Sequence, residues 1–256
     1  MPEKERPLAL MDLSGSELPW EQVISLLAQG RIEITGQFVH GSNYTFLVTL
    51  SDETSRITAV YKPVRGENPL WDFPNRTLAK RETAAFVLSE RLGWRLVPPT
   101  VFRKEAPLGA GSLQFFVEHD INRHYFSLPP ARLEELHPVV LFDVIANNAD
   151  RKGSHLIFDS NGRLWLIDHG LCFNIEEKLR TVIWDFAGEP VPLFLLQDLE
   201  RILPGLQRGE EMNTQLHFFL SFAEIKALEK RVRAVLTSGT YPLPPADRRA
   251  YPYPPL

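Results

Sequence analysis

The feature that most constrains the fold is the stretch of residues 141–173, LFDVIANNADRKGSHLIFDSNGRLWLIDHGLCF. Its apolar beginning is typical of the end of a buried helix, and a polar loop around Asp150 follows. Two alternating apolar runs, residues 155–158 and 164–167, flank an Asp-Ser-Asn-Gly sequence in which Asn-Gly is a strong hairpin signal. The predicted hairpin brings Asp168 back towards Asp150.

Two carboxylates presented in this way match the needs of phosphoryl transfer. Asp150 lies in a loop after a helix, and Asp168 ends a strand just before Gly170. One carboxylate takes or orients the proton of an attacking hydroxyl, and the other holds magnesium on the nucleotide phosphates. Asn148 and His155 are further candidate ligands. Each motif alone also has a structural interpretation, as a helix cap, a surface pair or a turn. We interpret their combination, in this order, as catalytic.

Two motifs resemble a known kinase family: Asn-Ala-Asp-Arg at residues 148–151 and Ile-Asp-His-Gly-Leu at residues 167–171. They look like the catalytic loop and metal motif of the type II phosphatidylinositol 4-kinases, which read Asn-Thr-Asp-Arg and Ile-Asp-Asn-Gly-Leu. The loop is also similar to that of HipA-like serine/threonine kinases, and small bacterial phosphatidylinositol-kinase-like proteins share the pattern. The resemblance implies an atypical protein-kinase-like fold with Asn148, Asp150 and Arg151 in the catalytic loop.

One position departs from the family pattern. The related kinases usually carry Asn five positions after the loop Asp as a second metal ligand, and here that position is His155. Imidazole is a poorer magnesium ligand than an amide oxygen and suits softer metals. Either Asp168 and His155 bind metal together and manganese is tolerated, or the second metal site is weakened. The second case leaves open the alternative of a nucleotide-binding pseudokinase that works as an interaction module.

The N-terminal part of the chain predicts an antiparallel sheet. A helix is expected to begin near residue 19 and to end at Gly30. Strands are expected over residues 31–39, 44–50, 56–63, from 98–101 onwards, and over 113–117. The turn with Gly41, Ser42 and Asn43 is either a phosphate-covering loop, as in kinases, or an ordinary hairpin loop.

Nucleotide binding is predicted from four residues outside that turn. Lys62 lies near the end of the third strand, where the kinase fold places the lysine that pairs with the α- and β-phosphates; a solvated strand-edge lysine is the alternative. The resemblance implies that Glu82, in a helix expected over residues 77–93, pairs with this lysine. Val117 and Glu118 would form the connection to a second lobe, where backbone groups meet the adenine edge.

The C-terminal part is expected to be mainly helical. Apolar residues recur at helical spacing over residues 132–148, and residues 193–203 are apolar on one side. A capping box at Ser221 opens a helix that ends near Gly239. Residues 173–192 correspond to an activation or substrate loop.

These elements predict an α+β protein with a two-lobed protein-kinase-like fold. Residues 1–17 are interpreted as a loose lead-in. Residues 1–256 would form a single kinase-like domain, with an antiparallel-sheet N-lobe over about 18–117, a mainly helical C-lobe over about 118–240 and a proline-rich tail over 241–256. The tail is expected to be extended and to dock on the domain or on a partner.

Composition restricts the partners. The chain has 256 residues and 44% apolar composition, enough for a large core. Its formal net charge of −4 does not favour nucleic acid binding. No run approaches the roughly 18 to 20 apolar residues of a transmembrane helix, and the start, MPEKERPLAL, lacks the core of a secretory signal. Cys172 is the single cysteine, which excludes an internal disulfide and a cysteine–zinc cluster. We expect a cytoplasmic protein.

The predicted function is ATP-dependent transfer of the γ-phosphate to a hydroxyl acceptor, with ATP and Mg²⁺ as cofactors and Mn²⁺ as an alternative metal. A protein serine or threonine is slightly favoured over a phosphoinositide head group, since no basic amphipathic membrane helix is obvious. A small metabolite is also compatible. A plain structural domain is a further alternative, which requires that Lys62, Glu82, Asp150 and Asp168 do not converge.

Overall fold

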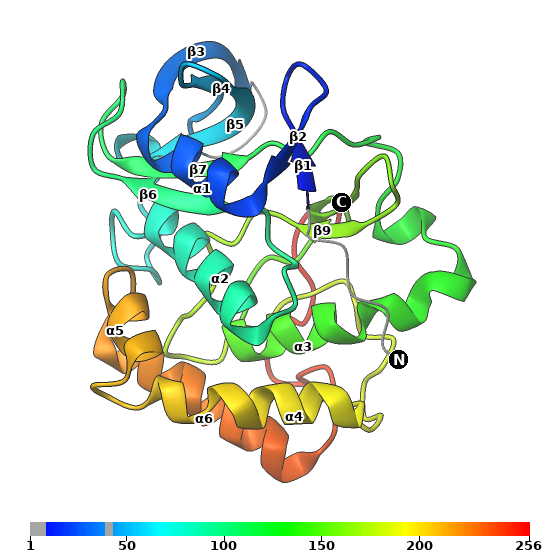
Figure 1. The fold of residues 1–256 in the computed structure, drawn as a ribbon. Coiled ribbons are helices and arrows are strands. Elements are labelled where there is room, and N and C mark those ends of the chain that lie inside the picture. The colour runs from blue at the N-terminus through cyan, green and yellow to red at the C-terminus, as the bar shows by residue number, and fades with distance from the viewer. Residues whose placement is uncertain (1–8, 39–42) are drawn as a thin grey trace. The chain divides into compact units, whose positions relative to one another are not determined.

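The computed structural model describes residues 9–38 and 43–256. The chain divides into two compact units (Figure 1), the first made of Met1–Ala79 and Pro98–Val117 and the second of Lys80–Val97 and Glu118–Leu256. The first unit is built on an antiparallel sheet and the second mainly on helices. This division of secondary structure confirms the predicted α+β class.

A five-stranded sheet forms the centre of the first unit. Its strands are β3 (Arg31–Phe38), β4 (Thr45–Ser51), β5 (Arg56–Pro63), β6 (Thr100–Arg103) and β7 (Gly111–Phe115), in the order β3-β4-β5-β7-β6 with every neighbouring pair antiparallel. Along β5, Ile57, Ala59 and Tyr61 are buried, because alternate side chains point to one face of a strand. Helix α1 (Trp20–Gln29) packs against β6 and β7 with its apolar side (Figure 1).

The first strands form a hairpin where the sequence predicted a loose lead-in, so that prediction is wrong for residues 9–17. Strand β1 (Ala9–Met11) pairs with β2 (Glu17–Pro19). The Asp12 carboxylate accepts hydrogen bonds from the backbone N–H groups of Ser14 and Ser16, both at 2.8 Å. An aspartate that bonds its own following backbone replaces the hydrogen bonds of a regular turn, which a reading based on apolar periodicity overlooks.

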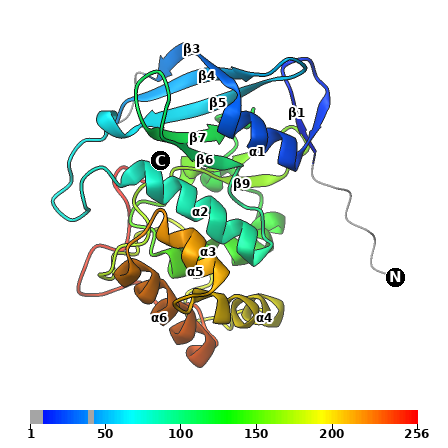
Figure 2. The ribbon, with the colours of Figure 1, turned by 60° about the vertical axis from the view of Figure 1, so that its left-hand side comes forward.

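Five α-helices of the described part of the chain lie wholly or mainly in the second unit. They are α2 (Leu78–Leu92, whose first two residues belong to the first unit), α3 (His137–Ala146), α4 (Leu193–Ile202), α5 (Glu211–His217) and α6 (Phe222–Ser238). Helix α6 contacts α3, α4 and α5 (Figure 2). Helix α5 was not predicted from the sequence. Within the described parts of the chain, no helix combines the length and apolar character that a membrane span requires.

The helix before the catalytic loop is shorter than predicted. In place of one helix over residues 132–148, a 3₁₀ segment (Pro130–Leu136) precedes α3. Pro138 lies in the first turn of α3, where its missing N–H costs nothing, whereas inside a continuous helix it would break a hydrogen bond and clash with the preceding turn. Asn147 ends α3 in the left-handed conformation, with φ 53° and ψ 54°.

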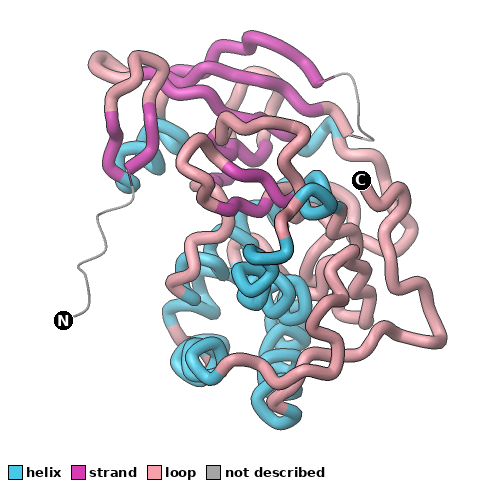
Figure 3. The backbone as a smooth tube through the Cα atoms, turned by 90° about the vertical axis from the view of Figure 1, so that its right-hand side faces the viewer, coloured by secondary structure: helices cyan, strands magenta, loops and turns pink. Residues whose placement is uncertain are grey.

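The predicted hairpin after the catalytic loop is confirmed. Strands β8 (Leu156–Phe158) and β9 (Leu164–Leu166) pair antiparallel, and Gly162 in their turn has a φ of +78°. The chain from β9 to α4 is mostly loop (Figure 3). The proline-rich tail lies on the second unit, since Thr181 N donates to Ala250 O at 3.1 Å and Gly153 N donates to Pro255 O at 2.8 Å.

Candidate catalytic site

Buried polar side chains shape the loop that carries Asp150. The Asn148 side chain is fully buried; its Nδ2 donates to Asp143 Oδ1 and its Oδ1 accepts from Asp150 N, both at 3.0 Å. Both ends of this amide are therefore engaged within the loop. Asn148 fixes the turn that presents Asp150.

Arg151 connects this loop to the metal motif. Its buried guanidinium donates to Asp143 through Nε (2.9 Å) and Nη2 (3.0 Å), and Nη1 donates to Ile167 O at 3.0 Å. Nη2 also lies 2.9 Å from His169 Nε2. Arginine can only donate, so His169 Nε2 accepts and the imidazole is neutral with its proton on Nδ1. A buried guanidinium requires such partners. Arg151 thus ties Asp143 to residues 167 and 169 by hydrogen bonds.

Asp150 is the half-buried carboxylate of the loop. Burial raises its pKa, the ammonium group of Lys152 lowers it, and the carboxylate of Asp168 raises it. The Lys152 Nζ lies 3.4 Å from Asp150 Oδ2. The two predicted carboxylates are thus within electrostatic reach of each other.

Asp168 occupies a strained turn beside His155. Its φ is +62°, a left-handed value that is uncommon outside glycine. The His155 Nε2 lies 3.4 Å from Asp168 Oδ2, so the two predicted metal ligands are adjacent. The backbone N–H of His169 donates to Glu82 Oε2 at 2.9 Å, which holds the residue after Asp168 in place. Strain of this kind persists only where its surroundings fix it, and it concentrates at functional sites.

Helix α2 also bonds to the segment that follows Asp168, through contacts that the sequence did not predict. Arg81 Nη1 donates to Cys172 O at 2.6 Å, and its Nη2 forms a buried ion pair with Glu224. Together with Glu82, Arg81 holds both ends of residues 169–172. Arg81 and Glu82 are adjacent in the sequence, but their partners lie 87 to 143 positions away, so local spacing did not reveal these contacts.

The predicted phosphate-covering turn is described only in part. Gly41 and Ser42 lie outside the described residues. Asn43 Oδ1 accepts a hydrogen bond from Asn68 N at 2.8 Å, which ties the end of this turn to the segment that follows β5.

The other predicted nucleotide residues lie on regular elements or at the unit boundary. Lys62 is half-buried on β5 and pairs in register with Ser112 of β7. Val117 is the buried last residue of the first unit, and Glu118 is the exposed residue that resumes the second. Lys62 belongs to the first unit and Glu82 to the second, and their ion pair stays a prediction.

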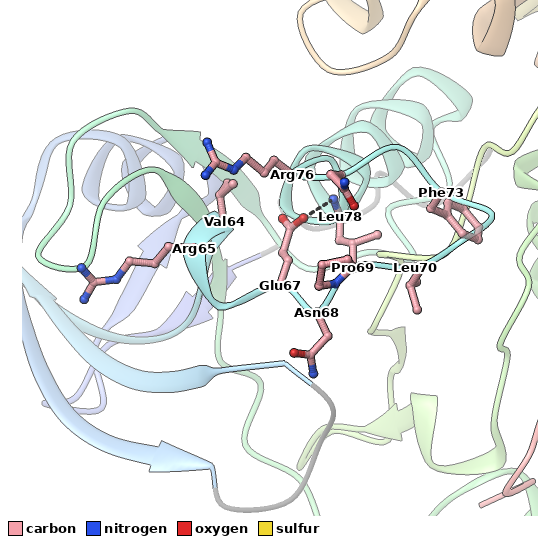
Figure 4. Close-up of a pocket in the computed structure, with 10 residues that line it drawn as sticks. Val64, Arg65, Glu67, Asn68, Pro69, Leu70, Phe73, Arg76 and Leu78 are labelled. Carbon is pink, nitrogen blue, oxygen red and sulfur yellow. Dashed lines mark hydrogen bonds between the residues drawn. The ribbon is translucent and has the colours of Figure 1, made fainter.

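A surface pocket of about 280 Å³ lies in the first unit between β5 and α2 (Figure 4). Glu67 lines it, and its carboxylate accepts from Leu78 N at 3.1 Å and Ala79 N at 2.9 Å. Glu67 therefore satisfies the first N–H groups of α2, in the place where an anionic ligand would bind a helix. None of the predicted site residues that the structure describes lines this pocket.

Comparison with known proteins gives the family. The model of the family described as phosphatidylinositol 3- and 4-kinase matches residues 75–226, which include both motifs. Protein Rv2133c of Mycobacterium tuberculosis is 35% identical over 259 residues, 88% of this chain and 92% of that protein. Phosphatidylinositol 4-kinase gamma 4 of Arabidopsis thaliana is 33% identical over 140 residues, 44% of this chain and 25% of that protein. The chain belongs to the phosphatidylinositol 3- and 4-kinase family.

Solved structures agree on the fold. The Golgi casein kinase with Mn/ADP bound is 15% identical with a TM-score of 0.56, over 93% of this chain and 80% of that one. Hydra Fam20 with sugar is 16% identical with a TM-score of 0.52, over 83% of this chain and 86% of that one. These likenesses confirm the predicted kinase-like fold.

Proposed function

We propose that the protein is an ATP-dependent phosphotransferase that moves the γ-phosphate of ATP to a hydroxyl acceptor. The observation that carries this proposal is the juxtaposition of Asp150, on a loop fixed by buried side chains, with the Asp168–His155 pair. In the proposed reaction the acceptor oxygen attacks the γ-phosphorus, the bond to the β-phosphate oxygen breaks, and ADP leaves. Asp150 accepts the proton of the hydroxyl.

Asp168 and His155 are the proposed metal ligands. Among the residues that the structure describes, no group of three or more His, Cys, Asp or Glu side chains is arranged to hold a metal ion. Mg²⁺ is commonly bound through one or two carboxylates together with substrate phosphates, so this sparse donor set fits a metal that binds with the nucleotide. The imidazole also admits Mn²⁺. When bound, the metal neutralises phosphate charge.

The proposed nucleotide contacts are the residues that the family resemblance assigns to this role. Lys62 would pair with the α- and β-phosphates and Glu82 with Lys62, while the turn ending at Asn43 would cover the phosphates. Val117 and Glu118 would offer backbone groups to the adenine. The binding of Mn/ADP by the Golgi casein kinase, whose fold this chain shares, supports nucleotide and divalent-metal use.

The proposed acceptor is a protein serine or threonine, ahead of a phosphoinositide head group or a small metabolite. The fold is shared with a casein kinase, and the family also includes enzymes named for phosphatidylinositol. Fold does not fix the acceptor. The test below therefore separates acceptor classes.

The experiment measures transfer of labelled γ-phosphate from ATP, with Mg²⁺ or Mn²⁺, into the protein, lipid and small-molecule fractions of a lysate. We expect Asp168→Ala to abolish transfer. We expect Asp150→Ala to keep nucleotide binding and to lower turnover on the order of 10²- to 10⁴-fold, the usual contribution of a general base. Asp247→Ala, at an exposed carboxylate in the tail, is the matched control with unchanged transfer. Full activity of Asp150→Ala or Asp168→Ala would refute that residue's role.

A nucleotide-binding pseudokinase is the second candidate function, and His155 in the usual Asn position is the observation that favours it. ATP binding without label in any fraction, with either metal, would support this candidate over the first.

A further inference from the structure

We propose that Asn147 is a positioning residue that fastens the catalytic loop to residues 174–178, where the proposed substrate loop begins. It thereby holds Asp150 in the geometry needed for transfer. The kinetic consequence rests on the proposed function, whereas the fastening itself is independent of it.

The backbone of Asn147 sets the direction of the loop. Its left-handed conformation ends α3, and its N–H still bonds Val144 O at 3.2 Å. Asparagine adopts this conformation more readily than most residues, and glycine does so freely. The next three residues are Asn148, Ala149 and Asp150.

The side chain of Asn147 is fully buried and bonds to backbone atoms of residues 174–178. Its Nδ2 donates to Asn174 O at 3.0 Å and to Glu176 O at 2.6 Å, and its Oδ1 accepts from Lys178 N at 2.8 Å. Two donors and one acceptor on a short side chain define a carboxamide. An aspartate of the same shape would lose both donors and place its oxygens against two carbonyls.

A short backbone ladder continues from this contact. Arg180 N donates to Asn148 O at 2.9 Å, Arg151 N donates to Arg180 O at 3.0 Å, and Val182 N donates to Arg151 O at 3.1 Å. Asp150 lies between the two loop residues that take part. Asn147 therefore stands at the start of the ladder that borders Asp150 on both sides.

A second buried side chain holds the same carbonyl from α6. Arg231 donates through Nε to Ile145 O at 2.7 Å and through Nη1 to Asn174 O at 3.2 Å. Asn174 O thus receives hydrogen bonds from both Arg231 and Asn147. Because Arg231 anchors Asn174 without contacting residues 148–151, loss of Asn147 should loosen the ladder while the start of the segment stays attached.

The test compares Asn147→Gly, which keeps the left-handed backbone and removes the carboxamide, with Asn147→Asp, which keeps the shape and removes both donors. Asn122→Gly, at an exposed Asn, is the control. Nucleotide affinity, kcat and KM are measured together with tryptic cleavage after Lys178 and Arg180. We expect nucleotide affinity to be unchanged and kcat to fall on the order of a hundredfold, the scale of a catalytic group displaced by about 1 Å. Cleavage at the two sites should accelerate about tenfold, because local opening exposes them.

Two outcomes would overturn the proposal. One is a normal kcat in Asn147→Gly with cleavage as slow as in the wild type. The other is a parallel loss of nucleotide affinity, melting temperature and kcat, which marks general destabilisation. If the wild type transfers no phosphate, the proposed function fails, and the cleavage rates alone decide whether Asn147 fastens the segment.

Discussion

His155 follows Asp150 by five positions, where related kinases carry Asn, and its Nε2 lies 3.4 Å from Asp168 Oδ2. An imidazole nitrogen suits softer metals better than an amide oxygen does. We therefore expect the identity of this one side chain to affect which metal supports the proposed transfer.

We expect His155→Asn to shift metal preference towards Mg²⁺, because an amide oxygen is a harder ligand than an imidazole nitrogen. The ratio of kcat/KM with Mn²⁺ to kcat/KM with Mg²⁺ should fall by on the order of tenfold. This is the lower end of the change in affinity or activity that follows mutation of a residue beside a bound metal. His217→Asn, at an exposed histidine, should leave the ratio unchanged. An unaltered ratio in His155→Asn would remove His155 from the proposed metal site.

The sequence predicted the candidate site residues better than it predicted the buried side chains that surround them. Asp150, Asp168 and His155 could be chosen from local spacing, and the structure brings them together. The buried network of Asp143 with Arg151 and the contacts of Arg81 depend on approaches between distant segments, which spacing does not encode. Arg151 was expected beside the chemistry, yet its guanidinium is completely enclosed.

At the scale of elements, the N-terminus of α6 is linked to the metal motif through α2. Ser221 and Glu224 form the predicted capping box, and Glu224 also pairs with buried Arg81, which in turn bonds Cys172 O. One carboxylate therefore serves a helix end and a loop. The capping box could be predicted from four consecutive residues, whereas the ion pair of Glu224 with Arg81 could not.

We expect the two capping residues to differ in their effect on stability. Ser221→Ala loses one cap and should lower the free energy of unfolding by about 1 kcal/mol. Glu224→Ala leaves the Arg81 guanidinium buried without its carboxylate and should cost about 3–5 kcal/mol. Urea unfolding measures both, with Lys226→Ala, at an exposed lysine whose partner Glu229 keeps Arg233, as a control that should cost less than about 1 kcal/mol. Equal losses in the two variants would show that the Arg81 pair adds no stability.

Elements with a regular spacing of apolar residues were predicted from the sequence. The hairpin β1–β2, which depends on a polar side chain, and the start of α3, which a proline sets, were not. The sheet strands and the hairpin β8–β9 follow alternation and an Asn-Gly turn. The hairpin β1–β2 depends on the Asp12 carboxylate, and Pro138 shortens α3. In both of these cases a specific backbone requirement overrode the apolar pattern.

At the scale of the whole molecule, the kinase-like fold was predictable because its motifs occur in a fixed order along the chain. The order in which the chain passes between the two units was harder to predict from the sequence. Lys80–Val97 belongs to the second unit, although the hairpin that follows, Pro98–Val117, belongs to the first. Most of α2 is thus part of the helical unit, through Arg81 to Glu224 and Arg91 to Gln215.

The helical unit should therefore fold alone only if α2 is supplied. In a fragment of residues 118–256 alone, Glu224 would lose its partner Arg81, and the apolar surface that packs on Leu88 would be exposed to water. We therefore expect this fragment to show no cooperative thermal transition. The matched fragment joins residues 80–97 to 118–256 by a short Gly/Ser linker, which is feasible because Phe115 N bonds Pro99 O at 2.8 Å at the base of the excised hairpin. This fragment should show one cooperative transition by calorimetry. Equal cooperativity of both fragments would mean that α2 is dispensable to the helical unit and that its contacts with the metal motif serve the site alone.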